Sequence, residues 1–278
     1  MKKCSKGIFL LYVCFFFFSL YAAEKPEDFS IIKKVTDGTL NFSTFELSIT
    51  GNGIPEMNVT NLNSARITAE KAAQSNARLK TVKILSSLVL VDKTTVGAYF
   101  ESRNHSDFIE KLVNTDDFRE IIHERFYSNS SVDLTYKVDI SGYMRKIAEA
   151  VKEGFPEAAS TAETAGDEAS KTKSVLLINV KKIEPALLMS LVDEKGEKIY
   201  DIATSGSARK SPLSVFFARK KADYLLEKSG LSGEKLSVNA FKITDSKIVL
   251  KKTDAEKIKS ELKKECFDEG KIIIVSAE

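Results

Sequence analysis

The sequence predicts an α+β fold, in which small mixed or antiparallel sheets pack with helices in two halves of the chain. Three observations predict it. Residues 132–140 alternate apolar and polar side chains without a fault, as a strand with one wet face does in an antiparallel sheet. Residues 62–85 repeat small side chains at helical spacing. Residues 157–173 contain no large apolar side chain, so we interpret them as a flexible linker between the halves.

Shifts in composition divide the chain into four segments. Residues 1–23 are a predicted signal peptide, and residues 24–156 a predicted N-terminal α+β domain. Residues 157–173 form the Ala-, Ser-, Thr- and Glu-rich linker, and residues 174–278 a C-terminal α+β domain. A chain of 278 residues has enough material for a sizeable hydrophobic core.

The first 23 residues have the three parts of a secretory signal. A basic start precedes an almost wholly apolar run at residues 8–20, and small residues follow before Glu24. The apolar run is too short for a comfortable membrane span. We therefore expect cleavage after Ala22 or Ala23, with an uncleaved N-terminal anchor as the alternative.

Cys14 lies inside the apolar run and raises the question of a lipid anchor. Lipoprotein processing needs a small residue directly before the cysteine, whereas Val13 precedes it here and four phenylalanines follow. This favours cleavage over lipidation, although the choice between the two stays open. Nothing beyond residue 23 approaches 18 consecutive apolar residues, so the mature chain is predicted to have no transmembrane helix.

The distribution of charge argues against a nucleic-acid binder. Lys and Arg number 42 against 39 Asp and Glu, which gives a formal net charge of +3. Lys2, Lys3 and Lys6 supply this excess, because the chain beyond residue 23 carries 39 charges of each sign. No domain-wide basic field remains to attract nucleic acid or an anionic membrane.

One cysteine, Cys266, remains beyond the signal segment, and a single thiol cannot form an internal disulfide. It follows Ala255, Ile258 and Leu262 at helical spacing. We interpret it as a buried residue on a helix face, rather than as a reactive thiol.

The N-terminal half begins with strands. Residues 40–49 form an extended run with a slip near Ser43–Thr44, where we expect a bulge, and residues 51–55 are expected to break it. A helix follows over residues 62–85, and its small side chains let it lie close to a sheet. Its predicted buried stripe consists of Ala65, Ala69, Ala72, Asn76 and Leu79, with Ala73 and Ala77 beside it.

Short elements are expected after this helix. Residues 88–91 and 96–100 are predicted strands around a turn at residues 92–94, and a helix that buries Phe108, Leu112 and Val113 follows.

A second short helix is predicted to begin at a capping box formed by Asp117 and Glu120. It would bury Ile121, Ile122 and Phe126. The strand of residues 132–140 and a helix from Tyr143 to about Glu153 complete this half.

Strands dominate the C-terminal half. Residues 175–178 are a continuous apolar run, which suits a central strand. Residues 189–192 and 198–202 flank a hairpin turn that ends in Gly196. A helix is expected over residues 216–226. Further strands are expected at residues 238–243, 248–250 and 272–275.

A last helix is predicted between these strands. Thr253 and Glu256 have the spacing of a capping box at its start, and it would carry Cys266.

No residue qualifies as catalytic, cofactor-binding or metal-ligating, so we predict a protein without enzymatic activity. His105 and His123 are 18 residues apart, and neither has a second ligand at helical or hairpin spacing. The chain lacks the nucleophile-elbow and glycine-rich phosphate-binding motifs. Residues 205–207, Ser-Gly-Ser, are interpreted as a loop.

Two features suggest contact with other molecules. Basic residues at 209–210 and 219–221 could form a patch, although a solvated helix face is the commoner meaning. The alternating strand of residues 132–140, if it lies at a sheet edge, would offer its backbone to another chain. Edge pairing is the one physical route to assembly that the sequence indicates.

Several short segments, taken in order, resemble a family of bacterial envelope proteins. This family comprises small outer-membrane lipoproteins, the N-terminal domain of flagellar assembly protein T and flagellar outer-membrane protein P. The matching segments are residues 64–77, 133–140, 176–180, 184–187, 192–196, 199–200, 253–258 and 270–275. Two departures from the family are the poor lipid-attachment motif at Cys14 and the linker of residues 157–173.

The resemblance implies a non-catalytic protein of the periplasm, associated with the outer membrane, with a structural or assembly role in flagella or motility. It implies no site residues and no cofactor, and its expected partners are envelope or flagellar-ring proteins or further copies of the chain. One alternative is a periplasmic binding module for a glycan or small ligand. Another is a hydrolase whose triad brings His105 or His123 beside a serine and a carboxylate.

Overall fold

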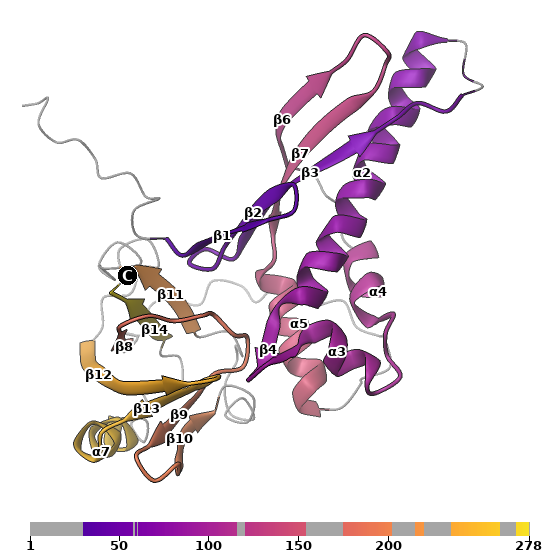
Figure 1. Cartoon of the computed structure of the whole chain (residues 1–278). Helices are drawn as coiled ribbons and strands as arrows, with labels where there is room; N and C mark the ends of the chain where they lie inside the picture. Colours follow the sequence, from indigo (N-terminus) through magenta and orange to yellow (C-terminus); the bar gives the residue numbers. More distant parts are fainter. Residues whose placement is uncertain are drawn as a thin grey trace, which may run out of the picture.

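Two large sheets and the two-stranded sheet β4-β5, with packed helices, make up the described part of the chain (Figure 1). The computed structural model describes residues 30–57, 59, 61–115, 120–153, 175–201, 215–219, 235–261 and 271–277. The predicted signal peptide and the predicted linker lie outside these residues. A five-stranded antiparallel sheet in the N-terminal half and a seven-stranded mixed sheet in the C-terminal half confirm the predicted α+β class.

The described helices of the N-terminal half are α2 (Leu62–Ser87), α3 (Val96–Glu101), α4 (Phe108–Asn114) and α5 (Ser141–Glu153). Its strands are β1 (Ile32–Val35), β2 (Gly38–Asn41), β3 (Glu46–Gly53), β4 (Val89–Val91), β5 (Thr94–Thr95), β6 (Glu120–Phe126) and β7 (Val132–Asp139). The C-terminal half contains β8 (Val175–Val180), β9 (Ser190–Asp193), β10 (Lys198–Asp201), β11 (Val215–Arg219), β12 (Lys235–Thr244), β13 (Lys247–Leu250), α7 (Lys252–Glu261) and β14 (Lys271–Ser276).

Strand β7 is central to the five-stranded sheet, whose order is β1-β2-β3-β7-β6. Its alternation is as predicted, because Val132, Leu134, Tyr136 and Val138 are buried on one face. Its position is not the edge considered from the sequence, since β3 pairs with one side of β7 and β6 with the other. Among the described residues, the edge strand on this side of the sheet is β6.

Helix α2 lies unusually close to strand β3. A Cβ atom added to Gly53 would fall 1.8 Å from the carbonyl oxygen of Ala69, and one added to Gly51 would fall 2.0 Å from that of Ala73. The predicted strand break at residues 51–55 is therefore wrong at its start, because β3 runs through Gly53. These glycines are needed for close packing against the helix.

The buried stripe of α2 is a run of small residues at i,i+4 spacing. Its members are Ala65, Ala69, Ala73, Ala77 and Thr81, which face the sheet. Ala73 and Ala77 thus lie within the stripe, whereas the predicted member Leu79 is exposed. On the same helix Arg66 and Glu70 form an i,i+4 ion pair, with 3.1 Å between Nε and Oε1.

Polar side chains of α2 form hydrogen bonds with the part of β3 that extends beyond the end of β2. Strand β2 pairs with β3 only as far as Ile49. Beyond it, Asn76 Oδ1 accepts a hydrogen bond from the Asn52 N–H at 3.1 Å. Lys80 Nζ donates to the Thr50 carbonyl at 2.8 Å and to Asn52 Oδ1 at 2.7 Å. These bonds satisfy backbone groups that a longer β2 would have paired.

The bulge predicted at Ser43–Thr44 is a chain reversal instead. Strands β2 and β3 are antiparallel partners with Asn41 opposite Glu46, so the intervening residues form a hairpin turn. Asn41 Oδ1 accepts from the Ser43 N–H at 2.8 Å, and Phe45 has a φ of 55°. An asparagine that bonds the backbone two residues on is a common way to stabilise such a turn.

Two predicted elements have the opposite secondary structure. Residues 96–100 belong to helix α3 and not to a strand, because the Thr95 hydroxyl accepts from the Ala98 N–H and caps the helix. Residues 120–126 form strand β6 and not a capped helix, because the neighbouring β7 provides a full antiparallel partner. Ile121, Ile122 and Phe126, predicted to be buried, are exposed.

Strand β8 is central in the seven-stranded sheet, as predicted, with parallel neighbours β12 and β14. The sheet order is β10-β9-β13-β12-β8-β14-β11. The β9–β10 hairpin is also confirmed, since Gly196 has a φ of 82° and its N–H donates to the Asp193 carbonyl at 2.9 Å.

Two predictions in the C-terminal half are wrong. Residues 215–219 form strand β11 beside β14, where a helix was expected, because the apolar strand β14 offers a parallel partner. The remainder of that predicted helix lies outside the described residues. Helix α7 begins at Lys252, so Thr253 lies within the first turn and does not cap it. Ala255 and Ile258 are buried as predicted, and Cys266 lies outside the described residues.

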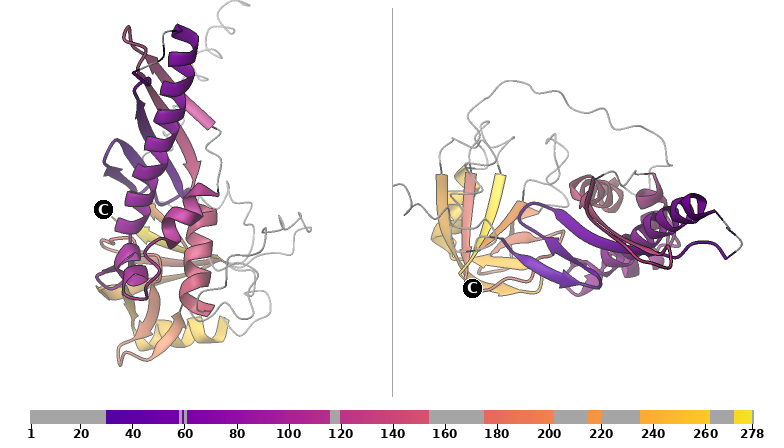
Figure 2. Two further views of the ribbon diagram at one scale, coloured as in Figure 1. Left: turned by 90° about the vertical axis from the view of Figure 1, so that its right-hand side faces the viewer. Right: turned by 90° about the horizontal axis from the view of Figure 1, so that it is seen from above.

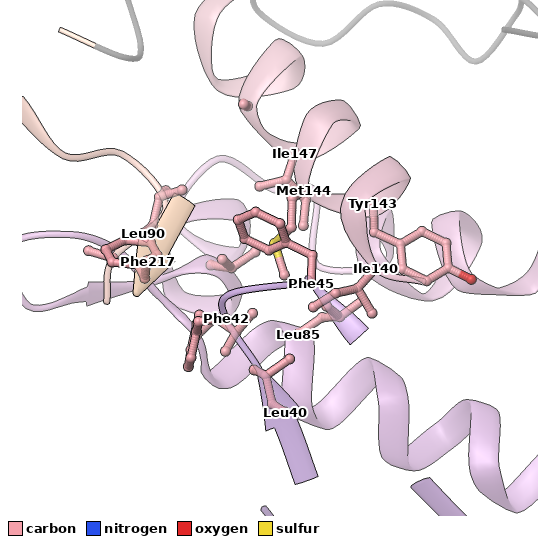
Figure 3. Packing of buried hydrophobic residues seen from close by; sticks show 14 of the residues in the cluster. Leu40, Phe42, Phe45, Leu85, Leu90, Ile140, Tyr143, Met144, Ile147 and Phe217 are labelled. Carbon is pink, nitrogen blue, oxygen red and sulfur yellow. The ribbon is translucent and has the colours of Figure 1, made fainter. Parts of the chain in front are cut away.

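One apolar cluster contains residues of both halves. Phe42, between β2 and β3, meets Phe217 of β11 edge to face, with ring centroids 6.2 Å apart (Figure 3). The carbonyls of Val89 and Leu90 accept hydrogen bonds from the N–H groups of Leu187 and Leu188 at 2.9 and 2.8 Å. Backbone hydrogen bonds thereby join strand β4 to the C-terminal half.

Figure 2 shows the C-terminal sheet at one end of the molecule. The first turns of α2 and the β6–β7 hairpin extend away from it at the other end. Among the helices of the described residues, none combines the length and the apolar character needed to cross a bilayer.

Candidate interaction surface

The residues considered for chemistry from the sequence are dispersed. His105 lies in the turn before α4, where its carbonyl accepts from the Phe108 N–H at 3.0 Å. His123 lies on exposed strand β6, not on a helix. Within the described ranges, no group of three or more His, Cys, Asp or Glu side chains is placed to hold a metal ion. Residues 205–207 and Cys266 lie outside those ranges.

The most unusual surface of the N-terminal half is strand β6. All seven of its residues are exposed, and its large apolar side chains Ile121, Ile122 and Phe126 are 41%, 50% and 42% accessible. It is the terminal strand of its sheet, so its outer row of backbone groups has no neighbouring strand among the described residues. Such an edge is a template for pairing with another chain.

Cross-strand register shows which β6 side chains share the face covered by α2. Ile121 is opposite Tyr136, Glu124 opposite Leu134 and Phe126 opposite Val132. The three β7 residues are buried, and opposed residues in an antiparallel pair project from the same face. Ile121, Glu124 and Phe126 therefore project on the α2 side of the sheet.

Helix α2 lies next to these residues, on the same face of the sheet. The Arg66 guanidinium lies 3.7 Å from the centre of the Phe126 ring, while its Nε also pairs with Glu70. Leu62 is one turn earlier on the same side of α2 and is largely exposed. We call the surface formed by Leu62, Arg66, Ile121, Glu124 and Phe126 the β6 shelf. Figure 1 shows β6 and β7 running alongside the first turns of α2.

Apolar side chains continue from the β6 shelf onto the connection between β3 and α2. Ile54, Met57 and Leu62 are more exposed than any other large apolar side chain of the described residues. Tyr127, directly after β6, is also exposed. A run of exposed large apolar side chains at one end of a protein is typical of a contact surface.

Hydrogen bonds brace the far end of the β6–β7 hairpin. The Tyr127 hydroxyl donates to Asp133 Oδ2 at 2.6 Å, and Asn52 Nδ2 donates to Asp133 Oδ1 at 2.7 Å. The bond from Tyr127, then that from Asn52, holds the pKa of the Asp133 carboxyl below its ordinary value. The same bond raises the pKa of Tyr127, whose neutral form it favours.

The basic patch considered from the sequence is only partly described. Arg219 ends β11 and is exposed, which agrees with a solvated position. Residues 209–210 and 220–221 lie outside the described residues.

The strand considered from the sequence as a possible edge, β7, lies one position inside the sheet, next to the edge strand β6. The segment 120–126 was assigned to a helix because Asp117 and Glu120 fit a capping box. The signal for a strand was present in the adjacent isoleucines and in the short turn before β7.

The C-terminal half of the chain resembles a domain of a known protein. Residues 161–278 match the family model described as Treponema pallidum Tp0624, second domain. No curated protein matches the chain. The matched residues include every described strand of the seven-stranded sheet, whereas the β6 shelf lies outside them. The matched description names no flagellar protein, so the flagellar resemblance stays a prediction.

Proposed function

We propose that this protein is an exported, non-catalytic component of the cell envelope with a structural or assembly role. The proposed location is the periplasm, at or near the outer membrane. The N-terminal pattern of a basic start, an apolar run and small residues supports export. A flagellar or motility role is the finer form of the proposal, and it depends on the segment resemblance alone.

The observation that carries the assembly role is the β6 shelf. An edge strand that is exposed on both of its faces and carries large apolar side chains suits a protein that acts by pairing with another chain. The expected partners are envelope or flagellar-ring proteins or further copies of the chain.

Export is tested by mass spectrometry of the protein recovered from fractionated cells. A periplasmic protein that begins at Ala23 or Glu24 is expected, and an acylated Cys14 would instead indicate a lipid-anchored form. A cytoplasmic protein that retains Met1 contradicts export.

The assembly role is tested by deleting the gene and scoring envelope integrity and motility. A defect in either that the intact gene restores is expected. Loss of motility with an intact envelope favours the flagellar form. A strain unchanged in both contradicts the assembly role.

A further inference from the structure

Strand β6 offers both a backbone edge and a side-chain surface to an incoming strand. Its inner side pairs with β7 from Glu120 to Phe126, apart from a register shift between Ile121 and His123. Neighbouring residues of a strand direct their N–H and C=O groups to opposite sides. Alternate residues of β6 therefore present both groups outward, at the edge of the sheet.

The edge lacks some of the features by which proteins prevent strand addition. Natural edge strands are commonly protected by proline, by charged side chains (above all lysine), by β-bulges, by covering loops or by being short. Residues 120–126 contain neither proline nor lysine, and the strand is seven residues long. Its one irregularity is a register shift against β7 between Ile121 and His123.

A second copy of the chain is a poor occupant of this edge. Two identical antiparallel strands related by a two-fold axis must place one residue opposite itself. Only three such registers pair five or more of the seven β6 residues, and they are centred on Ile122, His123 and Glu124.

Each of these registers sets unfavourable neighbours opposite one another. In the register centred on Glu124, the Glu124 carboxylates of the two copies lie opposite each other. In the register centred on Ile122, Glu120 of one copy lies opposite Glu124 of the other. Centring on His123 places Ile122 opposite Glu124 and Ile121 opposite Arg125. Like charges opposed across strands are destabilising, and an apolar side chain opposed to a charge forms no favourable cross-strand pair.

The charges of the β6 shelf specify the complementary partner. Arg66 is already engaged by the Glu70 carboxylate and by the Phe126 ring. Glu124 is exposed between the apolar ends of the shelf, and the pairing of Arg66 with Glu70 leaves the Glu124 carboxylate accessible to a basic side chain of a partner. A strand with a basic side chain between two apolar ones matches this order.

We propose that the β6 shelf binds an extended segment of a different protein, which adds to the sheet as a sixth strand beside β6. Its basic side chain pairs with Glu124, and its apolar side chains cover Phe126 and Ile121. This inference deepens the assembly role proposed above by naming the surface and the chemistry of the partner. Binding measurements with purified protein test the surface without reference to export or motility.

The probe is the end-capped peptide Thr-Val-Thr-Lys-Thr-Val-Thr, with a fluorophore on a flexible N-terminal spacer. It reads the same in both directions, so it serves parallel and antiparallel addition alike. A second peptide replaces its lysine with glutamate. Fluorescence anisotropy is expected to show saturable binding of the lysine peptide, about fivefold to tenfold tighter than that of the glutamate peptide.

Charge reversal supplies the matched test. Glu124→Lys is expected to invert the preference, so that the glutamate peptide binds more tightly. Glu110→Lys makes the same change at an exposed position of α4 and is expected to leave the preference of the unaltered protein intact. Amide exchange followed by NMR is expected to show new protection at alternate residues of β6 when the lysine peptide is bound.

Three results overturn the proposal. The first is absence of saturable binding at millimolar peptide. The second is binding that ignores the charge at position 124 or leaves the β6 amides unprotected, which indicates contact elsewhere. The third is a dimer in sedimentation without peptide whose formation protects the same amides, which makes a second copy the occupant.

Discussion

Asp92 and Ser246 exchange hydrogen bonds across the junction between the two halves of the chain. The Asp92 N–H donates to Ser246 Oγ, and the Ser246 N–H donates to Asp92 Oδ1 at 3.4 Å. Asp92 lies in the β4–β5 turn with a φ of 54°, and Ser246 follows Asp245, whose φ is 53°, in the β12–β13 turn. Two tight turns from distant parts of the sequence are thus held against each other.

Removing the Ser246 hydroxyl tests this link. Ser246 is buried, so Ser246→Ala leaves the Asp92 N–H without its acceptor, and we expect a loss of about 1–3 kcal/mol in the free energy of unfolding. Urea denaturation measures it. Ser260→Ala, which removes an exposed hydroxyl from α7, is the control and is expected to change stability by less than about 0.5 kcal/mol. Equal losses in the two variants would contradict the link.

The close approach of α2 to β3 predicts that Gly53 and Gly51 cannot be replaced. Gly53→Ala and Gly51→Ala each force a methyl group against a helix carbonyl, and each is expected to cost at least about 2 kcal/mol. Gly142→Ala is the control, because an added Cβ there meets no atom within 4 Å and α5 gains a better helix former. Thermal unfolding compares the three, and a stable Gly53→Ala variant argues against the packing.

The ring contact between Phe42 and Phe217 predicts energetic coupling between the halves. Both side chains are buried, and edge-to-face pairs contribute about 0.5–1.5 kcal/mol beyond their buried area. A double-mutant cycle with Phe42→Leu and Phe217→Leu measures this term by urea denaturation. Additive losses, or separate unfolding transitions for the halves, are the contrary outcomes.

The lowered pKa of Asp133 predicts that the free energy of unfolding decreases at acidic pH. Its pKa is lowered in the folded chain, so the folded state binds fewer protons than the unfolded chain, where the pKa is about 3.9. The contribution is present above that value and is lost as the pH falls through the folded pKa. Tyr127→Phe removes the strongest of the bonds and is expected to raise the pKa of Asp133 toward the unfolded value.

NMR titration of the Asp133 carboxyl carbon measures this pKa. Tyr99→Phe, a matched change on α3, is expected to leave the titration where it is in the unaltered protein. The bond from Asn52 remains in both variants, so only part of the shift is expected to disappear. An unchanged titration in Tyr127→Phe excludes the bond as the main cause.

The elements predicted correctly are those whose sequence pattern and tertiary role agree. Strand β7 alternates because one of its faces is covered by α2. The alanines of α2 indicate a close helix–sheet contact, which the structure places at Gly51 and Gly53. Even here the sequence misplaced Leu79, since the spacing alone does not fix which of two adjacent rows of small residues faces the sheet.

The elements predicted wrongly owe their structure to a distant neighbour. Strand β11 needs β14, which is more than fifty residues further along the chain. Strand β6 forms because β7 pairs with it, whereas the charged residues at its start have the spacing of a helix N-terminus. The β6 shelf was missed for the same reason, because an edge is defined by the absence of a further strand and no local pattern reports it. The alternation that did suggest an edge belonged to the strand beside it.

Helix α2 has a mechanical consequence. Its 26 residues extend about 39 Å, and at Ala69 and Ala73 its backbone rests almost directly on β3. One end begins beside the β6 shelf, and the other leads into β4 at the contact with the C-terminal half. A molecule bound at the β6 shelf is therefore separated from the C-terminal half by a rigid helix and not by a flexible linker. A displacement of the N-terminal end of α2 would for that reason be transmitted to β4.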